Sequence, residues 1–256
     1  MRNKIVTIYL SFLLILAVLN IFALNIFYDK YTQLEQLRDD RFIMLTTGDE
    51  LRQSSDDLSR FAKTYVVTGD EEYKDNYYAI LDIRDGLLER PYYYEGIYWD
   101  LLEPIRSQRH RPNNKEVFED KITELPYEDN ELKMLQKAKD LSDKLVSLEE
   151  EAFYAMQGKF KDENGEYNIE KSIDQTLAIK LLHSERYHIE KAKVVLPIDN
   201  FIFLLTKRTS LEIHDLQKIV DSSFFIFIFS FIVFLLSIIS FIYFDRKNIK
   251  NAFIEE

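Results

Sequence analysis

The chain has 256 residues, and its 44 Asp and Glu residues outweigh 33 Lys and Arg residues to give a formal net charge of -11. This length predicts one or two domains and excludes a large multidomain enzyme, while the acidic balance argues against a general affinity for nucleic acid. The chain contains no Cys, which excludes disulfides, iron–sulfur clusters, thiolate zinc sites and Cys nucleophiles.

Two apolar segments, residues 5–27 and 222–244, carry no charged side chain, and each is long enough to cross a hydrocarbon core of about 30 Å as a helix. A cleaved signal peptide is the alternative for the first segment, because Arg2 and Lys4 precede it. Its apolar run is longer than a typical signal-peptide core, however, and no small-residue cleavage site follows it. We therefore predict two transmembrane helices.

Basic residues flank the outer ends of both segments, at Arg2, Lys4, Arg246, Lys247 and Lys250. Because the cytoplasmic flanks of transmembrane helices are enriched in Lys and Arg, we expect residues 1–4 and 245–256 in the cytoplasm. Residues 28–221 are then extracytoplasmic, and their lack of Cys is compatible with an oxidising compartment.

The first span is expected to continue as a helix, because no Pro occurs before Pro91, and the helix is expected to end near the turn signal Thr68-Gly69-Asp70. Apolar residues recur along this helix every seven positions, at Leu37, Met44, Leu51, Leu58 and Tyr65. This spacing predicts the seam of a helical bundle or coiled coil.

Further helices are expected at residues 71–88, at residues 129–160 and from Ile169 to the second span, with a polar turn at 161–165. Four Pro residues between 89 and 127 predict an irregular excursion with one brief helix at 97–102. The last helix is expected to include Pro197 without ending there.

Apolar residues again recur every seven positions in this last segment, at Leu182, Ile189, Leu196 and Phe203. Together the elements predict an all-α fold. We expect an extracytoplasmic antiparallel helical bundle, similar to a four-helix bundle but with an irregular excursion, flanked by two transmembrane helices.

The sequence lacks the motifs of common enzyme classes. Its 6 Gly are too scattered for a phosphate-binding loop, and neither a nucleophile elbow nor a zinc-protease motif is present. Glu185 and His188 form one Glu-x-x-His unit, whereas a dinuclear site in a bundle needs two such units and two further Glu. We therefore predict no catalytic residue, no metal and no cofactor.

Residues 51–60 hold the densest polar chemistry of the first helix. Arg52 and Asp56, like Asp56 and Arg60, are four residues apart, which is typical of ion pairs on a solvated helix face. The functional alternative is that Ser55 lies on the apolar seam, where a bound ligand would supply its hydrogen-bond partner.

Residues 91–100 are rich in aromatic side chains with acidic neighbours. One interpretation is an aromatic cage for a cationic amine, and the one we prefer is a lid that plugs the bundle with buried rings. Arg106, Arg109 and Arg111 follow in a Pro-bounded loop, where we expect solvated side chains and no anion site.

If the chain binds a ligand, we predict the site between the first helix and the excursion, on Arg52, Ser55, Asp56, Tyr65, Tyr98, Trp99 and Asp100. The excursion is long enough to fold over the end of the helix as a lid. The carboxylates of Asp56 and Asp100 favour a cationic or hydroxyl-rich small molecule, and Arg52 either pairs with Asp56 or contacts a carboxylate of the ligand.

Seven blocks of sequence, in order, carry a resemblance to a known family: residues 52–58, 65–73, 80–86, 96–101, 182–188, 191–193 and 197–199. They resemble the N-terminal sensory region of bacterial two-span membrane receptors, mainly hybrid sensor histidine kinases and related transducers, with chemoreceptor or nucleotide-cyclase outputs in some. The resemblance covers most of residues 30–210. It implies a place in the bacterial inner (cytoplasmic) membrane, but it does not imply a ligand. Together with the seam of Leu37, Met44, Leu51 and Leu58, the resemblance predicts a parallel homodimer.

We therefore expect a membrane receptor input module that senses an extracytoplasmic cue, either a small molecule or a periplasmic binding protein. The two spans would relay the cue to a cytoplasmic output resembling a histidine kinase. Since only residues 245–256 follow the second span, we expect a sensory fragment of a longer product or a truncated gene product. The alternative is a structural or scaffold membrane protein whose bundle binds a protein partner.

Overall fold

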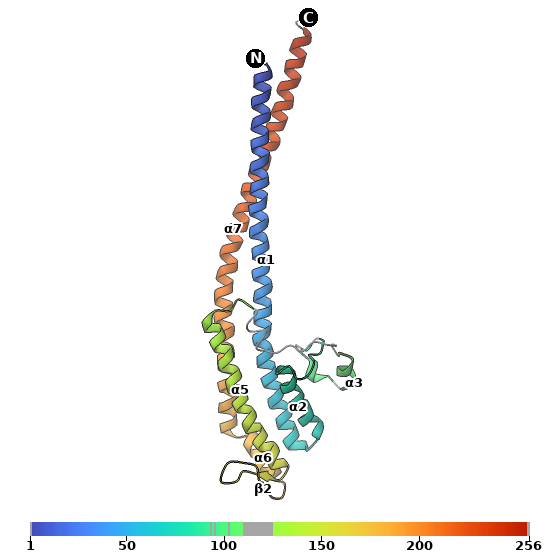
Figure 1. Ribbon diagram of the computed structural model, residues 1–256, viewed down its shortest axis with the longest axis vertical. Coiled ribbons are helices and arrows are strands. Elements are labelled where there is room, and N and C mark those ends of the chain that lie inside the picture. Colours follow the sequence, from blue (N-terminus) through green and yellow to red (C-terminus); the bar gives the residue numbers. More distant parts are fainter. Residues whose placement is uncertain (1, 93, 95, 102, 110–124, 255–256) are drawn as a thin grey trace. The chain divides into compact units, whose positions relative to one another are not determined.

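The computed structural model describes residues 2–92, 94, 96–101, 103–109 and 125–254 (Figure 1). The longer elements are the helices α1 (Arg2–Thr68), α2 (Glu71–Arg84), α5 (Asp129–Met156), α6 (Gln175–Leu182) and α7 (Glu185–Ile254). The shorter ones are η1 (Tyr98–Asp100), α3 (Glu103–Arg106), η2 (Ser107–Arg109) and the antiparallel strands β1 (Lys159–Phe160) and β2 (Ile169–Glu170). The predicted helical class is confirmed, with one small hairpin added.

Local sequence signals set the helix boundaries. α1 ends before Gly69, whose φ of 71° favours Gly and whose N–H donates to the carbonyl four residues earlier at 2.8 Å. Asp70 then caps α2 by accepting a hydrogen bond from the N–H of Glu72 at 3.0 Å. α5 begins with a capping box formed by Glu128 and Glu131.

The chain forms two compact units, and α1 and α7 contribute to both. Unit 1 comprises Met1–Asp39 and Arg208–Glu256, and unit 2 comprises Asp40–Lys207.

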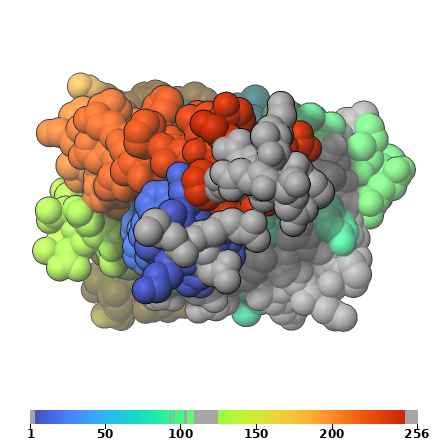
Figure 2. Space-filling model, turned by 90° about the horizontal axis from the view of Figure 1, so that it is seen from above, coloured from blue at the N-terminus to red at the C-terminus, as the bar shows by residue number. Residues whose placement is uncertain are grey.

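In unit 1 the first part of α1 pairs with the last part of α7 (Figures 1 and 2). The rings of Phe27 and Phe224 have centres 5.4 Å apart, and the hydroxyl of Ser230 donates to Oδ1 of Asn20 at 2.9 Å. Residue numbers decrease along α1 from Phe27 to Asn20 while those of their partners increase along α7 from Phe224 to Ser230, so the two segments are antiparallel.

By length and composition, α1 and α7 are candidate membrane spans, and the predicted segments 5–27 and 222–244 lie within them. Many of their large apolar side chains are exposed, including Phe22 at 63% and Phe229 at 71%. A core helix of a water-soluble protein buries its apolar face instead. The exposure therefore fits helices whose surroundings are lipid.

Buried side chains from α1, α2, α5, α6 and α7 form one core cluster in the described part of unit 2. The predicted seam of α1 lies in this core, since Met44, Leu51, Leu58 and Tyr65 are each at most 2% exposed. Gly48 lies on the same helix, and a Cβ at that position would be 2.5 Å from Cε1 of Phe201 of α7. From Met44 to Tyr65 the seam therefore packs inside the chain's own core.

Two predicted helix ends are wrong. α2 stops at Arg84 instead of residue 88, and Gly86 follows with a φ of 71°. α5 stops at Met156 instead of residue 160, because Gly158 turns the chain with a φ of 72° into the hairpin. A Cβ on Gly158 would clash with the Lys171 carbonyl oxygen, so the turn requires Gly.

The excursion predicted at residues 89–127 contains η1, α3 and η2 in its described part, and residues 110–124 lie outside the described residues. The brief helix expected at 97–102 is the shorter η1.

The predicted single helix from Ile169 onward is also wrong. β2 and α6 come first, and α7 starts anew after His183-Ser184, where the Ser184 hydroxyl accepts the Tyr187 N–H at 3.1 Å. This break ends the sevenfold register. The residues predicted to continue the seam are exposed, at 49% for Ile189, 61% for Leu196 and 63% for Phe203. The buried face of α7 carries Tyr187, Val194, Ile198, Phe201 and Leu205 instead. Pro197 lies inside α7 as expected.

Candidate functional site

The predicted polar residues of α1 form ion pairs at its surface. Arg52 lies 2.8 Å from Asp49 and 3.0 Å from Asp56, and the three side chains are 43%, 56% and 48% exposed. The hydrogen bond to Asp49 raises the pKa of Arg52 above its ordinary value. Exposed pairs of this kind contribute at most about 1 kcal/mol. Arg52 therefore fits the interpretation as a solvated helix-face ion pair.

Lys191 of α7 reaches the same part of α1. Its Nζ donates to Oγ of Ser55 at 2.7 Å and lies 3.0 Å from a carboxylate oxygen of Asp56. Ser55 is only 2% exposed, so the chain itself supplies the hydrogen-bond partner that the ligand hypothesis left to a bound molecule. Burial lowers the pKa of Lys191, and the bond to Asp56 opposes that effect.

Glu149 of α5 is a carboxylate side chain buried in the core of unit 2. It is 1% exposed and accepts hydrogen bonds from the hydroxyls of Tyr77 of α2 at 2.8 Å and Tyr187 of α7 at 2.5 Å. Burial raises the pKa of Glu149, while the two Tyr hydroxyls and the charge of Lys191 lower it.

We call Ser55, Asp56, Tyr77, Glu149, Tyr187 and Lys191 the interhelical polar network. It joins α1, α2, α5 and α7, whose unit 2 segments run side by side in Figure 1. Breaking a buried, hydrogen-bonded charge leaves its partner unsatisfied, which is strongly unfavourable. The network therefore couples the positions of four helices.

Sequence reasoning missed most of this network. The available signal was the position of Glu149, which follows Leu145 and precedes Ala152 at helical spacing on the buried stripe of α5. A charged residue on an apolar stripe needs a partner. The partners lie on other helices, so no local pattern identifies them.

The aromatic segment packs onto α1 through Trp99. The indole N–H donates to the hydroxyl of Tyr94 at 3.2 Å, and the ring meets Phe61 edge-to-face with centres 5.6 Å apart. Tyr94, Tyr98 and Trp99 are between 7% and 9% exposed. This burial fits the preferred interpretation of a plug of buried rings.

Arg60 of α1 binds this segment through a hydrogen bond and an ion pair. It donates to the Trp99 carbonyl at 3.3 Å, and it lies 3.4 Å from Asp100 and 2.5 Å from Asp57. These contacts replace the pairing with Asp56 that the spacing predicted. Burial raises the pKa of Asp57, and the bond from Arg60 opposes the increase.

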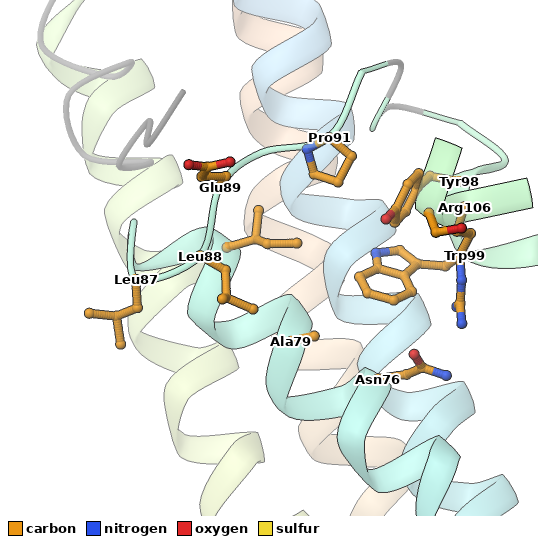
Figure 3. A pocket seen from close by; sticks show the side chains of 11 residues that line it. Asn76, Ala79, Leu87, Leu88, Glu89, Pro91, Tyr98, Trp99 and Arg106 are labelled. Carbon is orange, nitrogen blue, oxygen red and sulfur yellow. The ribbon is translucent and has the colours of Figure 1, made fainter. Parts of the chain in front are cut away.

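A cavity of about 660 Å³ lies beside Trp99 (Figure 3). Such a volume lies within the range of about 300–1,000 Å³ that is usual for small-molecule sites. In Figure 3 the side chains of Ala79 and Leu88 face those of Tyr98 and Trp99 across it. Its lining residues are Asn76, Ala79, Ile83, Leu87, Leu88, Glu89, Pro91, Tyr98, Trp99, Arg106 and Ser107.

Arg106 lines the cavity and is only 4% exposed. Its guanidinium carbon lies 5.1 Å from the centre of the Trp99 ring, and Nη2 lies 3.6 Å from Glu72. The prediction of a solvated Arg106 is therefore wrong, because a cation–π contact and an ion pair hold the side chain over the indole. The side chain of Arg109 and all of Arg111 lie outside the described residues.

The predicted site residues are divided among three places. In the first place, Arg52 pairs with Asp49, and Ser55 and Asp56 contact Lys191. In the second, Tyr98 and Trp99 line the cavity, and Asp100 beside them pairs with Arg60. The third is the end of α1, where Tyr65 lies. The hydroxyl of Tyr65 donates to Glu71 at 3.1 Å, and burial raises the pKa of Tyr65 to about 12. The cavity uses only Tyr98 and Trp99 of the predicted set.

Comparison of the chain with protein-family models, with curated proteins and with solved structures finds no match. A functional inference therefore rests on the cavity, the interhelical polar network and the two apolar helices.

Proposed function

We propose that this chain is the input module of a bacterial membrane receptor. Unit 2 senses an extracytoplasmic cue, and α1 and α7 relay it across the membrane to a cytoplasmic output of the histidine kinase type. The observation that carries the proposal is that the two helices with apolar spans are also linked inside unit 2 by the interhelical polar network.

The topology follows from the basic flanks of the spans. Residues 1–4 and 245–256 lie in the cytoplasm and residues 28–221 outside it, in the bacterial inner membrane. We assign unit 2 to antiparallel bundles of the four-helix type, built from α1, α2, α5 and α7.

Signalling would shift the population between two packings of this bundle. Lys191 holds α7 to α1, and Tyr187 on the same helix holds it to Glu149 of α5. A ligand in the cavity contacts α2 and the aromatic segment, and Trp99 of that segment packs on Phe61 of α1. A displacement of Trp99 therefore acts on a helix that contains a span.

The relay is testable without a known ligand. We would place Cys at Phe27 and Phe224, whose rings are in contact, in the Cys-free full chain in native membranes. Lys191→Met removes the links to Ser55 and Asp56, and we expect it to change the disulfide cross-linking rate of the pair severalfold. Lys193→Met is the matched control, because Lys193 is 52% exposed and pairs with Glu190 on its own helix. Equal rates in both variants would reject the relay.

The alternative, a membrane scaffold, is favoured by one observation. Ile189, Leu196 and Phe203 form an exposed apolar row on α7, and exposed apolar patches mark protein interfaces. The same row, and not the occupied seam of α1, is the face on which a parallel homodimer of the receptor would form. Cross-linking of single Cys variants at these positions to a second copy or to another protein separates the two cases.

A further inference from the structure

The cavity beside Trp99 has two chemically different walls. In Figure 3 the aromatic side chains of Trp99 and Tyr98 lie on one side, and the aliphatic side chains of Ala79 and Leu88 lie on the other. Trp99 is fixed in place by its hydrogen bond to Tyr94 and by its contact with Phe61. A rigid aromatic wall opposite an aliphatic one favours a flat apolar ligand body.

The charged residues of the cavity lie at opposite sides. Arg106 borders it next to Trp99, and Glu89 borders it across the opening (Figure 3). Arg106 is almost fully buried, and the Glu72 side chain that it approaches at 3.6 Å is 64% exposed. A buried guanidinium binds a carboxylate through two parallel hydrogen bonds and more strongly than a solvated one.

The opposite end of the cavity disfavours an anion. A ligand carboxylate near Glu89 would be repelled, whereas a hydroxyl or amine there would donate a hydrogen bond to it. The polar side chains of Asn76 and Ser107 complete the lining without adding charge. The two ends of the cavity therefore select opposite groups on one ligand.

We propose that this cavity binds a planar aromatic carboxylate, with the carboxylate at Arg106 and the ring system between Trp99 and the aliphatic wall. A hydroxyl or amine at the far end of the ligand lies toward Glu89. This proposal rests on the receptor function proposed above and names the chemical class of its cue. It replaces the cationic or hydroxyl-rich ligand that Asp56 and Asp100 predicted, because those carboxylates pair with Lys191 and Arg60.

Binding can be measured directly, because Trp99 is the only Trp of the chain. The full chain in lipid nanodiscs would be titrated with 2-naphthoate, 6-hydroxy-2-naphthoate and the neutral 2-naphthamide, with Trp fluorescence and calorimetry as readouts. We expect 6-hydroxy-2-naphthoate to bind most tightly and 2-naphthamide at least about tenfold more weakly, since it lacks the charge-assisted hydrogen bonds.

Three variants test the two ends of the cavity. Arg106→Gln should weaken 2-naphthoate at least about tenfold and leave 2-naphthamide nearly unchanged, while Glu89→Gln should tighten 2-naphthoate. Arg52→Gln is the matched control, because Arg52 is outside the cavity, and it should change neither affinity. If Arg106→Gln does not fold by circular dichroism, the Glu89→Gln result and the amide comparison decide.

The proposal is overturned if the naphthoates do not bind, if 2-naphthamide binds as tightly as 2-naphthoate, or if Arg106→Gln weakens both probes equally. The receptor function fails in a different way. If the naphthoates bind as expected but leave the cross-linking rate between Cys placed at Phe27 and Phe224 unchanged, the cavity proposal stands and the relay does not.

Discussion

The two units use the same two helices in opposite ways. In unit 2, α1 buries Met44 and Leu51 in an apolar core, and its polar side chains meet charged partners from other helices. In unit 1, Phe22 and Phe229 are exposed, and the polar pair of Asn20 and Ser230 lies between the helices. The exposed apolar surface of unit 1 suits lipid, whereas the apolar core of unit 2 suits water, because lipid accepts exposed apolar surface and water does not.

The largest expected effect is the loss of stability when a buried Phe of unit 2, rather than an exposed Phe of unit 1, is truncated. Phe153→Ala removes a side chain that is 2% exposed and packs at 4.9 Å from the Tyr77 ring, and it should destabilise unit 2 by about 3–5 kcal/mol. Phe229→Ala, at 71% exposure in unit 1, should leave the unfolding of unit 2 nearly unchanged. Denaturant unfolding followed by Trp99 fluorescence measures both, and equal losses would contradict the contrast.

The next largest effect tests the close packing of α1 against α7 in unit 2. Gly48→Ala places a methyl group 2.5 Å from the Phe201 ring, and overpacking of this kind costs about 1–3 kcal/mol. Phe201→Leu in the same chain should restore part of the loss by making room. Thermal melting measures the series, and a Gly48→Ala variant as stable as the parent would show that the helices separate at no cost.

Parts of the fold and of the candidate site differ in how far the sequence could predict them. The apolar candidate spans and the buried part of the seam of α1 were predictable, because each depends on a pattern within one helix. The break before α7 was not, because Ser184 acts as a cap only in the conformation that ends α6. The pairing of Glu149 with Tyr77 and Tyr187 and the burial of Arg106 depend on elements distant in the chain. For that reason Trp99 and Tyr98 were placed at a candidate site, while the rest of the cavity was missed.

In unit 1, Asn20→Ala removes the hydrogen bond to Ser230. Interhelical hydrogen bonds in apolar surroundings contribute about 1 kcal/mol, so we expect slower disulfide formation between Cys placed at Phe27 and Phe224. Leu19→Ala, whose native side chain is 52% exposed, serves as the control. Equal cross-linking rates in the two variants would show that the polar pair does not hold the helices together.

The smallest expected effect is a change in pH dependence. Burial raises the pKa of Glu149 above its ordinary value of 4.5, so the folded chain binds this proton more tightly than the unfolded chain does. The contribution of Glu149 to the free energy of unfolding is then largest below pH 4.5 and decreases as the pH rises through the raised pKa.

Glu149→Gln should lack this decrease, and urea unfolding at a series of pH values between 4 and 8 measures it. Glu163→Gln, an exposed change in the hairpin turn, should keep the parental profile. An unchanged profile in Glu149→Gln would show that another group causes the dependence.

In the proposed topology, unit 2 lies outside the cytoplasm between two spans. The Cys-free background allows single Cys residues to be placed at Asn130 and at Glu256 and labelled in spheroplasts with a membrane-impermeant maleimide. The account predicts that Asn130→Cys is labelled in intact spheroplasts, whereas Glu256→Cys is labelled only after the membrane is permeabilised. Protection of Asn130→Cys until permeabilisation would contradict the account.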